Sequence, residues 1–435
     1  MSLDLNFRKK SYAIYGLGLT GNSTLDYLKK NKVKDIFLWD DNLKKRKFFN
    51  LKNNKSLFEK MLDRVDYIII SPGINIEDCF FKKTLRRNFY KIITDIDLFF
   101  LSLHKESFQS IVVTGTNGKS TFCKILEHLL KKKGLDVKVG GNIGKPILKL
   151  KSKQKTIVII EASSFQLALS KFIKPKYAII LNITKDHLDW HRTMSNYIGS
   201  KLKVFEQQDR QDFAFIGDKQ IIKHYKKKNF LGKLNFHNKS RHQQTILKIK
   251  NSYLKLEMNK KNLELILSLT KFFNISNKSA IKYLNSFKGL PHRHEEFFNK
   301  EKIKFINDSK ATSFESTKYA LQSNKNIFWI LGGLPKKQDK IILGKLKNRI
   351  IKAFIIGKHP NFFKKQLKHK VKFDYFLSLK EAMQNIFLIL KRYNKLSTVL
   401  LSPASASYDQ YSSFEERGEE FKNLVKKYAR KHLKN

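Results

Sequence analysis

Short apolar runs alternate with longer amphipathic stretches along most of the chain. In the first part, mainly apolar runs at residues 11–15, 36–39 and 67–70 are separated by stretches with helical spacing. Strands that alternate with helices are typical of a parallel sheet with helices on its faces, so we expect a Rossmann-like unit here. The first run leads into the glycine-rich turn Gly16-Leu-Gly-Leu-Thr-Gly21, and we expect a helix from Asn22 onward.

The same pattern starts again near Asp95 and a third time near Leu290. Further strands are predicted at residues 111–113, 156–160, 177–181, 303–306, 327–331, 353–356 and 398–401, and a helix at residues 119–133. Residues 207–253 are polar and basic and indicate little about chemistry. We therefore expect an α/β protein of three domains, at residues 1–94, 95–289 and 290–435.

Composition adds two expectations. The 435 residues include 12% aromatic residues and only two cysteines, which favours folded domains in a reducing compartment. No apolar signal core or membrane-length run is present, so we expect a cytoplasmic protein without a membrane span.

The charge raises the question of nucleic acid. The chain has 88 Lys and Arg against 37 Asp and Glu, a formal net charge of +51. The basic residues are spread along the chain without a zinc-finger spacing or an RNA-binding aromatic signature. We favour a general compositional bias over specific nucleic-acid binding, and either reading predicts weak binding at low salt.

The first glycine turn satisfies the dinucleotide fingerprint, with a predicted strand before it and Asp40 near the expected distance. On spacing alone it favours a nicotinamide enzyme. Its physical content is broader, because such a turn presents backbone N–H groups and a helix N-terminus to any phosphate.

The second glycine turn, Val113-Thr-Gly-Thr-Asn-Gly-Lys-Ser-Thr121, is the stronger signal. Gly115 and Gly118 allow the backbone to wrap phosphate oxygens, Lys119 can reach the outer phosphates, and the hydroxyl of Ser120 or Thr121 can bind Mg²⁺. The turn departs from the strict P-loop because Val113 occupies the first glycine position. We expect a P-loop-type ATPase domain in the centre of the chain.

Acidic and histidine residues follow the next predicted strands. Glu161 comes directly after the strand at 156–160, and Asp186-His187 follows the strand at 177–181. The carboxyl ends of parallel strands meet at one sheet edge, so these side chains are candidate metal ligands beside the phosphate loop. Mg²⁺ prefers oxygen ligands, so Glu161 is the better candidate; Asp186-His187 alone is more typical of a helix cap.

The last part contains four polar motifs, several of which follow strands. They are Gly289-Leu-Pro-His-Arg293, Asn307-Asp-Ser-Lys-Ala-Thr312, Leu331-Gly-Gly333 and Ser402-Pro-Ala-Ser-Ala-Ser407. In this order, after a phosphate loop, the chain resembles the Mur ligases over essentially its entire length. Gly16–Gly21, Ser71-Pro-Gly-Ile74, Glu161-Ala-Ser-Ser-Phe-Gln-Leu167, Asn307–Thr312 and Ser402–Gln410 are most similar to the D-glutamate-adding branch of that family.

The resemblance implies an ATP-dependent amide ligase that adds D-glutamate to UDP-N-acetylmuramoyl-L-alanine through an acyl phosphate, in peptidoglycan precursor synthesis. It implies Rossmann-like first and last domains around the ATPase domain, with ATP and two Mg²⁺ ions as cofactors. We expect a monomer. By this resemblance the first glycine turn binds the uridine diphosphate of the substrate and no nicotinamide. Another Mur-type or folylpolyglutamate-type ligase, or a basic nucleic-acid-binding ATPase, is the alternative.

The family motifs also imply roles for individual residues. The ATP contacts are Gly115, Thr116, Asn117, Gly118, Lys119, Ser120, Thr121, Asn259, Arg293, Asp308 and Lys310. The nucleotide-sugar contacts are Leu19, Thr20, Ser71, Asn142, Ser163 and Gln166. The D-glutamate contacts are Thr312, Lys336, Ser407 and Phe414, the catalytic residues are Lys119, Glu161, His187 and Lys201, and the metal ligands are Ser120, Glu161, His187 and Lys201.

Two departures from the family pattern are visible. Only Met258-Asn-Lys-Lys-Asn262 remains of a Gly-x-His-Asn-x-x-Asn motif, and Asp41-Asn42 stands where some relatives have Thr-Arg.

Lys201 lies fourteen residues after His187, where the family has a lysine carbamylated by CO₂. A carbamate would replace a cation by an anionic oxygen ligand, which suits Mg²⁺. The alternative is a solvated helix lysine. Lys203, two positions away, is expected on a different helix face and is a candidate control.

Overall fold

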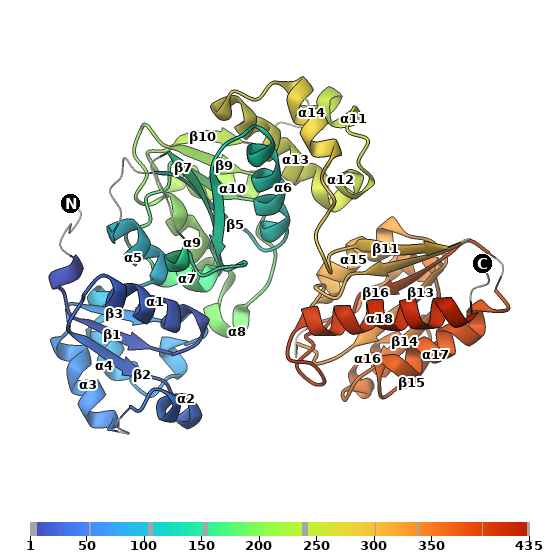
Figure 1. Cartoon of the computed structure of the whole chain (residues 1–435), viewed down its shortest axis with the longest axis horizontal. Helices are drawn as coiled ribbons and strands as arrows, with labels where there is room; N and C mark the ends of the chain where they lie inside the picture. Colours follow the sequence, from blue (N-terminus) through green and yellow to red (C-terminus); the bar gives the residue numbers. More distant parts are fainter. Residues whose placement is uncertain are drawn as a thin grey trace. The chain divides into compact units, whose positions relative to one another are not determined.

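The structure is a computed structural model that contains three sheets (Figure 1). It describes residues 7–51, 54–102, 108–150, 155–236, 242–300, 302–336, 339–393 and 395–432. The chain divides into two compact units, one formed by residues 1–250 and 260–287 and the other by residues 251–259 and 288–435. The first unit contains two of the sheets, and the two boundaries between the three domains expected from the sequence stay a prediction.

The first sheet is parallel, with the strand order β2-β1-β3-β4. Its strands are β1 (Tyr12–Tyr15), β2 (Ile36–Trp39), β3 (Tyr67–Ile70) and β4 (Ile92–Ile93). Its helices are α1 (Leu19–Lys30), α2 (Leu43–Phe48), α3 (Lys55–Arg64) and α4 (Lys82–Arg87). The three expected strands are confirmed, and the buried faces of β1 and β3 explain why the sequence there is continuously apolar.

The start of α1 differs from the expectation. The helix begins at Leu19, inside the glycine turn, and not at Asn22. Gly18 is the extended N-cap residue, and Gly21 already lies in the first helical turn. A Cβ at Gly21 would overlap the carbonyl oxygen of Gly16, so glycine there permits the close approach of the helix to the turn.

The second sheet is also parallel, with the order β10-β9-β8-β5-β7-β6. Its strands are β5 (Phe108–Thr114), β6 (Val137–Gly141), β7 (Thr156–Glu161), β8 (Tyr177–Ile180), β9 (Phe213–Ile216) and β10 (Lys233–Phe236). The helices of this part of the chain are α5 (Asp95–Ser102), α6 (Lys119–Lys132), α7 (Ser164–Leu169), α8 (Leu188–His191), α9 (Met194–Leu202), α10 (Lys219–Lys227), α11 (Gln243–Leu247), α12 (Ser252–Lys255), α13 (Glu257–Thr270) and α14 (Asn277–Asn285).

Strand β5 lies between β8 and β7 in the sheet. The chain leaves β5 through α6 toward β6, on the side of β7, whereas it leaves β8 toward β9, on the opposite side. The connections therefore change direction between β5 and β8. Open α/β sheets bind ligands at such a reversal, outside the carboxyl ends of the strands. The turn between β5 and α6, residues 115–118, is at this place.

The third sheet has the order β11-β12-β16-β13-β14-β15, parallel except for the edge strand β11. Its strands are β11 (Glu295–Lys300), β12 (Ile303–Asn307), β13 (Ile327–Gly332), β14 (Ile350–Ile356), β15 (Phe373–Phe376) and β16 (Ser397–Leu401). Its helices are α15 (Phe314–Ser323), α16 (Pro360–Leu367), α17 (Leu379–Leu390) and α18 (Phe414–His432); α17 and α18 pack together (Figure 1). Strands β12, β16 and β13 are neighbours, so the three polar motifs that follow them emerge at one edge.

None of the helices in the described residues has the length and apolar character that a membrane crossing requires.

Candidate active site

The first glycine turn is fixed by two side chains from neighbouring strand ends. Asp40, at the end of β2, accepts a hydrogen bond from the backbone N–H of Leu17 at 2.7 Å. Ser71, after β3, donates its Oγ–H to the carbonyl of Gly16 at 2.8 Å. Leu19 is exposed and Thr20 is partly exposed on the first turn of α1. The N-cap residue of this helix is Gly18, which has no side chain to cap the backbone N–H groups. The predicted residues Leu19, Thr20 and Ser71 thus belong to one turn and its support.

The second glycine turn is built around two glycines in positive-φ conformations. Gly115 has φ +155° and Gly118 has φ +83°. Asn182, two residues after the end of β8, accepts a hydrogen bond from the N–H of Asn117 at 2.9 Å and donates to its carbonyl at 3.0 Å. Ser120 and Thr121 are buried in the first turn of α6. The backbone is therefore shaped as a cradle at a helix N-terminus, the arrangement that binds phosphate.

Two lysines converge on the carbonyl of Gly115. Lys119 Nζ donates to it at 2.8 Å and to the carbonyl of Thr116 at 3.0 Å. Lys201 Nζ, from α9, donates to the same Gly115 oxygen at 3.0 Å. Lys201 is 1% exposed, and burial, together with the nearby charge of Lys119, places the pKa of its ammonium well below the usual range. The Lys201 amine is therefore favoured in its neutral form, and the alternative of a solvated lysine is wrong.

Tyr197, to which the sequence motifs gave no role, is a neighbour of this lysine pair. Its hydroxyl is 3.0 Å from Oγ1 of Thr116, and the Nζ of Lys201 lies 4.7 Å from the centre of its ring. Tyr197 precedes Lys201 by four residues, so both face the phosphate loop from one side of α9. That spacing was the signal that could have identified it.

Glu161 is the last residue of β7 and is 2% exposed. Its Oε1 accepts a hydrogen bond from Asn142 Nδ2 at 3.1 Å, whereas its buried Oε2 has no hydrogen-bond partner among the described residues. A buried carboxylate oxygen without a donor costs free energy unless a cation completes it. Glu161 and Asn142 therefore meet, and Glu161 fits a metal ligand.

His187 has a positive φ of 54° at the start of α8, and its ring packs edge-on against Phe165 of α7 with centroids 4.7 Å apart. Its Nε2 lies 3.4 Å from Oδ2 of Asp186. Among the described residues, no three His, Cys, Asp or Glu side chains converge as a metal site. The predicted set has only two such residues, so the metal site stays a prediction.

Ser163 and Gln166 form a capping box at the start of α7. Ser163 Oγ accepts from the N–H of Gln166 at 3.2 Å, and Gln166 Oε1 accepts from the N–H and hydroxyl of Ser163 at 3.1 and 3.0 Å. The two predicted nucleotide-sugar contacts are thus one hydrogen-bonded pair.

Lys203 lies on a different face from Lys201, as expected. Its Nζ donates to the carbonyls of Ala168 and Ser170 at 2.6 and 3.4 Å, at the C-terminal end of α7. Lysines at helix C-termini stabilise the last carbonyl groups. Lys203 is therefore a poor control for Lys201, because its removal would disturb α7.

Within the second unit, Asp308 is a buried carboxyl between two motifs. Ser402 donates its hydroxyl to Oδ2 at 2.7 Å, and the N–H of His294 donates to Oδ1 at 3.0 Å. Burial raises the pKa of Asp308 to about 7, although these hydrogen bonds and the charge of Arg293 oppose the rise. Arg293, partly exposed, precedes β11.

The remaining predicted residues surround the same sheet edge. Lys310 Nζ lies 3.9 Å from the ring centre of Phe414, the first residue of α18. Leu334 and Ala406 exchange two backbone hydrogen bonds, so the segments after β13 and β16 lie side by side. Lys336, on the first segment, is exposed, and Ser407, on the second, is buried. Thr312 is partly exposed just before α15.

Arg417 is a second residue that the sequence analysis missed. It is 1% exposed in α18 and donates to Ser309 Oγ and O at 3.0 and 2.9 Å, to Ser405 O at 3.1 Å and to Gly332 O at 3.3 Å. One guanidinium therefore links the three polar segments that follow β12, β13 and β16. Its position three residues after Phe414 on one helix was the available signal.

Two asparagines of α13 bear on the ATP site. Asn259 donates its Nδ2 to the carbonyl of Tyr253 at 2.8 Å, and its contact with ATP stays a prediction. Asn262, which received no role, lies against the phosphate loop: a Cβ at Gly118 would be 2.9 Å from its Nδ2. This buried Nδ2 has no hydrogen-bond partner among the described residues, so it can donate to a ligand there.

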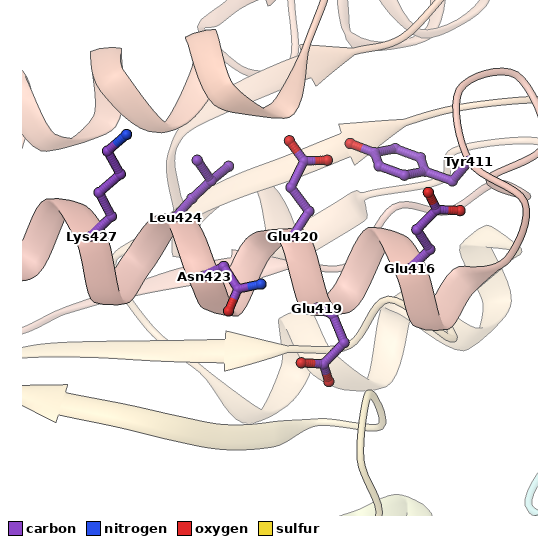
Figure 2. A pocket seen from close by; sticks show the side chains of 7 residues that line it. All are labelled: Tyr411, Glu416, Glu419, Glu420, Asn423, Leu424 and Lys427. Atoms are coloured by element: carbon purple, nitrogen blue, oxygen red, sulfur yellow. The ribbon is translucent and has the colours of Figure 1, made fainter.

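A surface pocket of about 450 Å³ lies beside α18 (Figure 2). Its walls contain none of the predicted site residues. They are Tyr411, Glu416, Glu419, Glu420, Asn423, Leu424 and Lys427.

Family models match two parts of the chain. The Mur ligase middle domain matches residues 113–282, and the Mur ligase MurD-like N-terminal domain matches residues 10–93. Together with the three sheets and the phosphate loop, these matches define the class as Mur ligases, and the chain belongs to this family.

Curated relatives narrow the class. The UDP-N-acetylmuramoylalanine–D-glutamate ligase of Rickettsia felis is 34% identical and covers 97% of this chain and 98% of its own length. The ligase of the same name from Oenococcus oeni is 32% identical over 97% of this chain and 98% of its own length.

Solved structures agree on the fold. MurF ligase of Thermotoga maritima, in complex with ADP, has a TM-score of 0.59 at 15% identity and covers 99% of this chain and 97% of its own. UDP-N-acetylmuramate–alanine ligase MurC of the same organism has a TM-score of 0.56 at 14% identity, with 96% and 99% covered. The expected α/β architecture of a Mur ligase is therefore confirmed.

Proposed function

We propose that the chain is an ATP-dependent amide ligase that adds D-glutamate to UDP-N-acetylmuramoyl-L-alanine in peptidoglycan precursor synthesis. The observation that carries the proposal is the phosphate cradle at Gly115–Gly118, with Lys119 and Lys201 at one of its carbonyls, in a chain similar over its length to D-glutamate ligases. The first glycine turn then binds the diphosphate of the nucleotide sugar, and the edge of the third sheet binds D-glutamate.

The proposed reaction has two steps. An oxygen of the alanyl carboxylate attacks the γ-phosphorus of ATP, the bond to the β-phosphate oxygen breaks, and ADP leaves. The amine of D-glutamate then attacks the acyl carbon and loses a proton, and inorganic phosphate leaves as the amide forms. Negative charge accumulates on the transferred phosphoryl group, and the Lys119 ammonium is positioned to stabilise it.

Magnesium fits the residues beside the cradle. Ser120 and Glu161 would hold one ion, and His187 and a carbamylated Lys201 a second. The buried Oε2 of Glu161, which has no hydrogen-bond partner among the described residues, supports the first of these assignments. When bound, the metal supplies Lewis-acid stabilisation of phosphoryl oxygens.

Carbamylation of Lys201 is part of the proposal. Only a neutral amine can attack CO₂; the new N–C bond forms as the nitrogen loses a proton, and an anionic carbamate results. The buried position of Lys201 and its lowered pKa favour the neutral amine. The carbamate would also place an anionic group, in place of that amine, near the Lys119 ammonium.

We also propose a cytoplasmic monomer of three domains with boundaries near residues 94 and 289. The charge of +51 is then a compositional property and implies no specific nucleic-acid partner.

Release of ADP by the purified protein tests the function. UDP-N-acetylmuramoyl-L-alanine and D-glutamate should both be required. Turnover with L-glutamate or meso-diaminopimelate instead would contradict the specific assignment, and turnover with a folate substrate would favour the folylpolyglutamate alternative. Sequence-selective DNA binding that resists physiological salt would favour the nucleic-acid alternative.

A further inference from the structure

Helix α7 is supported at both ends by the short segment that follows strand β4. At the C-terminal end, Oγ1 of Thr94 is 2.9 Å from Oγ of Ser170. Just beyond, Asp97 accepts hydrogen bonds from the backbone N–H groups of Lys171 and Phe172 at 3.0 and 2.8 Å. These contacts explain the placement of α7 and need no functional role.

The contact at the N-terminal end is of a different kind, because it reaches a side chain proposed to line the substrate. Asp95 is 2% exposed, and its Oδ1 accepts a hydrogen bond from Nε2 of Gln166 at 3.2 Å. An ionised carboxylate can only accept hydrogen bonds. Asp95 and the backbone N–H of Ser163, which donates to Gln166 Oε1 at 3.1 Å, therefore hold the Gln166 amide in one orientation, with its NH₂ group toward Asp95 and its oxygen toward Ser163.

The orientation of Gln166 in turn fixes the hydroxyl of Ser163. The Gln166 oxygen accepts from the Ser163 hydroxyl at 3.0 Å, which uses its only proton. The N–H of Gln166 donates to the Ser163 oxygen at 3.2 Å, which uses one of its two lone pairs. The partly exposed Ser163 oxygen thus retains one lone pair and no proton for a ligand.

We propose that Asp95 is a positioning residue that makes Ser163 an obligate hydrogen-bond acceptor toward a donor group, a hydroxyl or amide N–H, of the nucleotide-sugar substrate. The inference rests on the proposed function, in which Ser163 and Gln166 contact that substrate. Asp95 itself lies behind them and touches no substrate.

The burial of Asp95 supports a role beyond packing. Burial raises its pKa to about 6, although the Gln166 amide and the N–H of Ile96 favour the carboxylate. Keeping a carboxylate here at neutral pH therefore opposes folding. A neutral asparagine would avoid that cost but could also donate to Gln166, and the orientation of the amide would then depend on the Ser163 N–H alone.

The test exchanges the carboxylate of Asp95 and the amide of Gln166 between the two positions. Asp95→Asn should raise KM for UDP-N-acetylmuramoyl-L-alanine about tenfold, the scale of one hydrogen bond, and leave kcat and the KM for ATP and D-glutamate within about twofold. Gln166→Glu should also raise that KM, because it places two carboxyl groups in contact. The double variant Asp95→Asn/Gln166→Glu restores one carboxylate and one amide with the Ser163 contacts on the carboxylate, and its KM should return to within about threefold of the wild type.

Asp212→Asn is the matched control. Asp212 is another buried carboxyl whose pKa burial raises; it directly precedes β9 and accepts a hydrogen bond from the N–H of Asp209 at 3.0 Å. Its substitution should leave the KM for the nucleotide sugar unchanged.

The outcomes separate the two proposals. Absence of turnover by the wild type would overturn the proposed function. Turnover by the wild type with an unchanged KM in folded Asp95→Asn, or a double variant whose defect is the sum of the single defects, would overturn the role of Asp95 alone. If Asp95→Asn does not fold, the comparison of Gln166→Glu with the double variant gives the same decision, since only the positioning role predicts recovery.

Discussion

The two glycine turns of the first unit have the same backbone arrangement, a turn between a strand and a helix N-terminus, but different side chains around it. Each follows the central part of a parallel sheet and ends at a helix N-terminus, where backbone N–H groups can bind phosphate. Residues 16–21 contain no lysine or arginine, and the charged side chain that contacts this turn is a carboxylate, Asp40, which accepts a hydrogen bond from the N–H of Leu17. At Gly115, by contrast, two lysines donate to one carbonyl.

This difference in charge indicates that one turn only binds a phosphate group, whereas the other takes part in phosphoryl transfer. A diphosphate that is held but not transferred needs position, which a rigid turn supplies. A phosphoryl group in transfer gains charge in the transition state, and the protein must stabilise it. We infer that the second turn, with the Lys119 ammonium, is the reacting site, and that the first is a site of recognition.

Removal of the central cation should have the largest effect. Lys119→Ala should lower kcat by about a hundredfold or more, because it removes charge stabilisation from the transferred phosphoryl group. ADP release measures the loss, and an unchanged circular dichroism spectrum shows that the protein is folded. Near-normal turnover would mean that the two turns do not differ as we infer.

Lys201→Ala should come next. It should lose most activity and recover part of it when a short carboxylate such as acetate is added, because the carboxylate replaces the proposed carbamate oxygens. The wild type in ¹³CO₂ should show a carbamate signal by NMR that the variant lacks. Lys226→Ala, at an exposed position of α10, is the control and should behave as the wild type. Full activity of Lys201→Ala in CO₂-depleted buffer would contradict the metal site.

Substitution of a glycine in the first glycine turn, residues 16–21, should affect KM and the free energy of unfolding more than kcat. Gly21→Ala forces a Cβ onto the Gly16 carbonyl and should lower the free energy of unfolding by about 1–3 kcal/mol and raise KM for the nucleotide sugar. Gly18→Ala is the matched comparison, since its Cβ has no atom within 4 Å and its φ is −78°. Urea unfolding should leave Gly18→Ala within about 0.5 kcal/mol of the wild type; equal destabilisation of both would contradict the packing argument.

Asp40→Asn should have the smallest effect, about 1 kcal/mol, and depend on pH. Burial alone would raise the pKa of Asp40, but the N–H groups of Leu17 and Asn42 and the Lys45 ammonium keep it below its usual range. The folded state therefore binds the proton less tightly than the unfolded state, so the stabilisation is present above about pH 4 and is lost as pH falls through the lower folded-state pKa. The difference between variant and wild type in urea unfolding should shrink in acid; a difference independent of pH would indicate that the charge of Asp40 is irrelevant.

Much of the fold could be predicted, because the buried parallel strands are continuous apolar runs. The start of α1 could not, since the helix begins within the motif and depends on contact between Gly21 and Gly16. Edge strands such as β10, Lys233–Phe236, are short and mixed in polarity and carry no clear periodic signal.

The candidate site was predictable where a motif is contiguous. Gly115–Thr121 is one segment, whereas Tyr197, Arg417 and Asn262 act through contacts with distant segments. Arg417 shows the limit most clearly, because its hydrogen-bond acceptors are mainly backbone carbonyls, which no residue identity reveals.

The hydrogen bonds of Thr94 also bear on protein engineering. Thr94 donates its N–H to Asp97 at 2.8 Å, and its hydroxyl contacts Ser170, so a cut between residues 94 and 95 would leave Asp97 and the end of α7 short of partners. A recombinant central fragment for crystallisation or isotope labelling should therefore start upstream of β4, and the expected gain is a higher yield of folded material than from a start at Asp95.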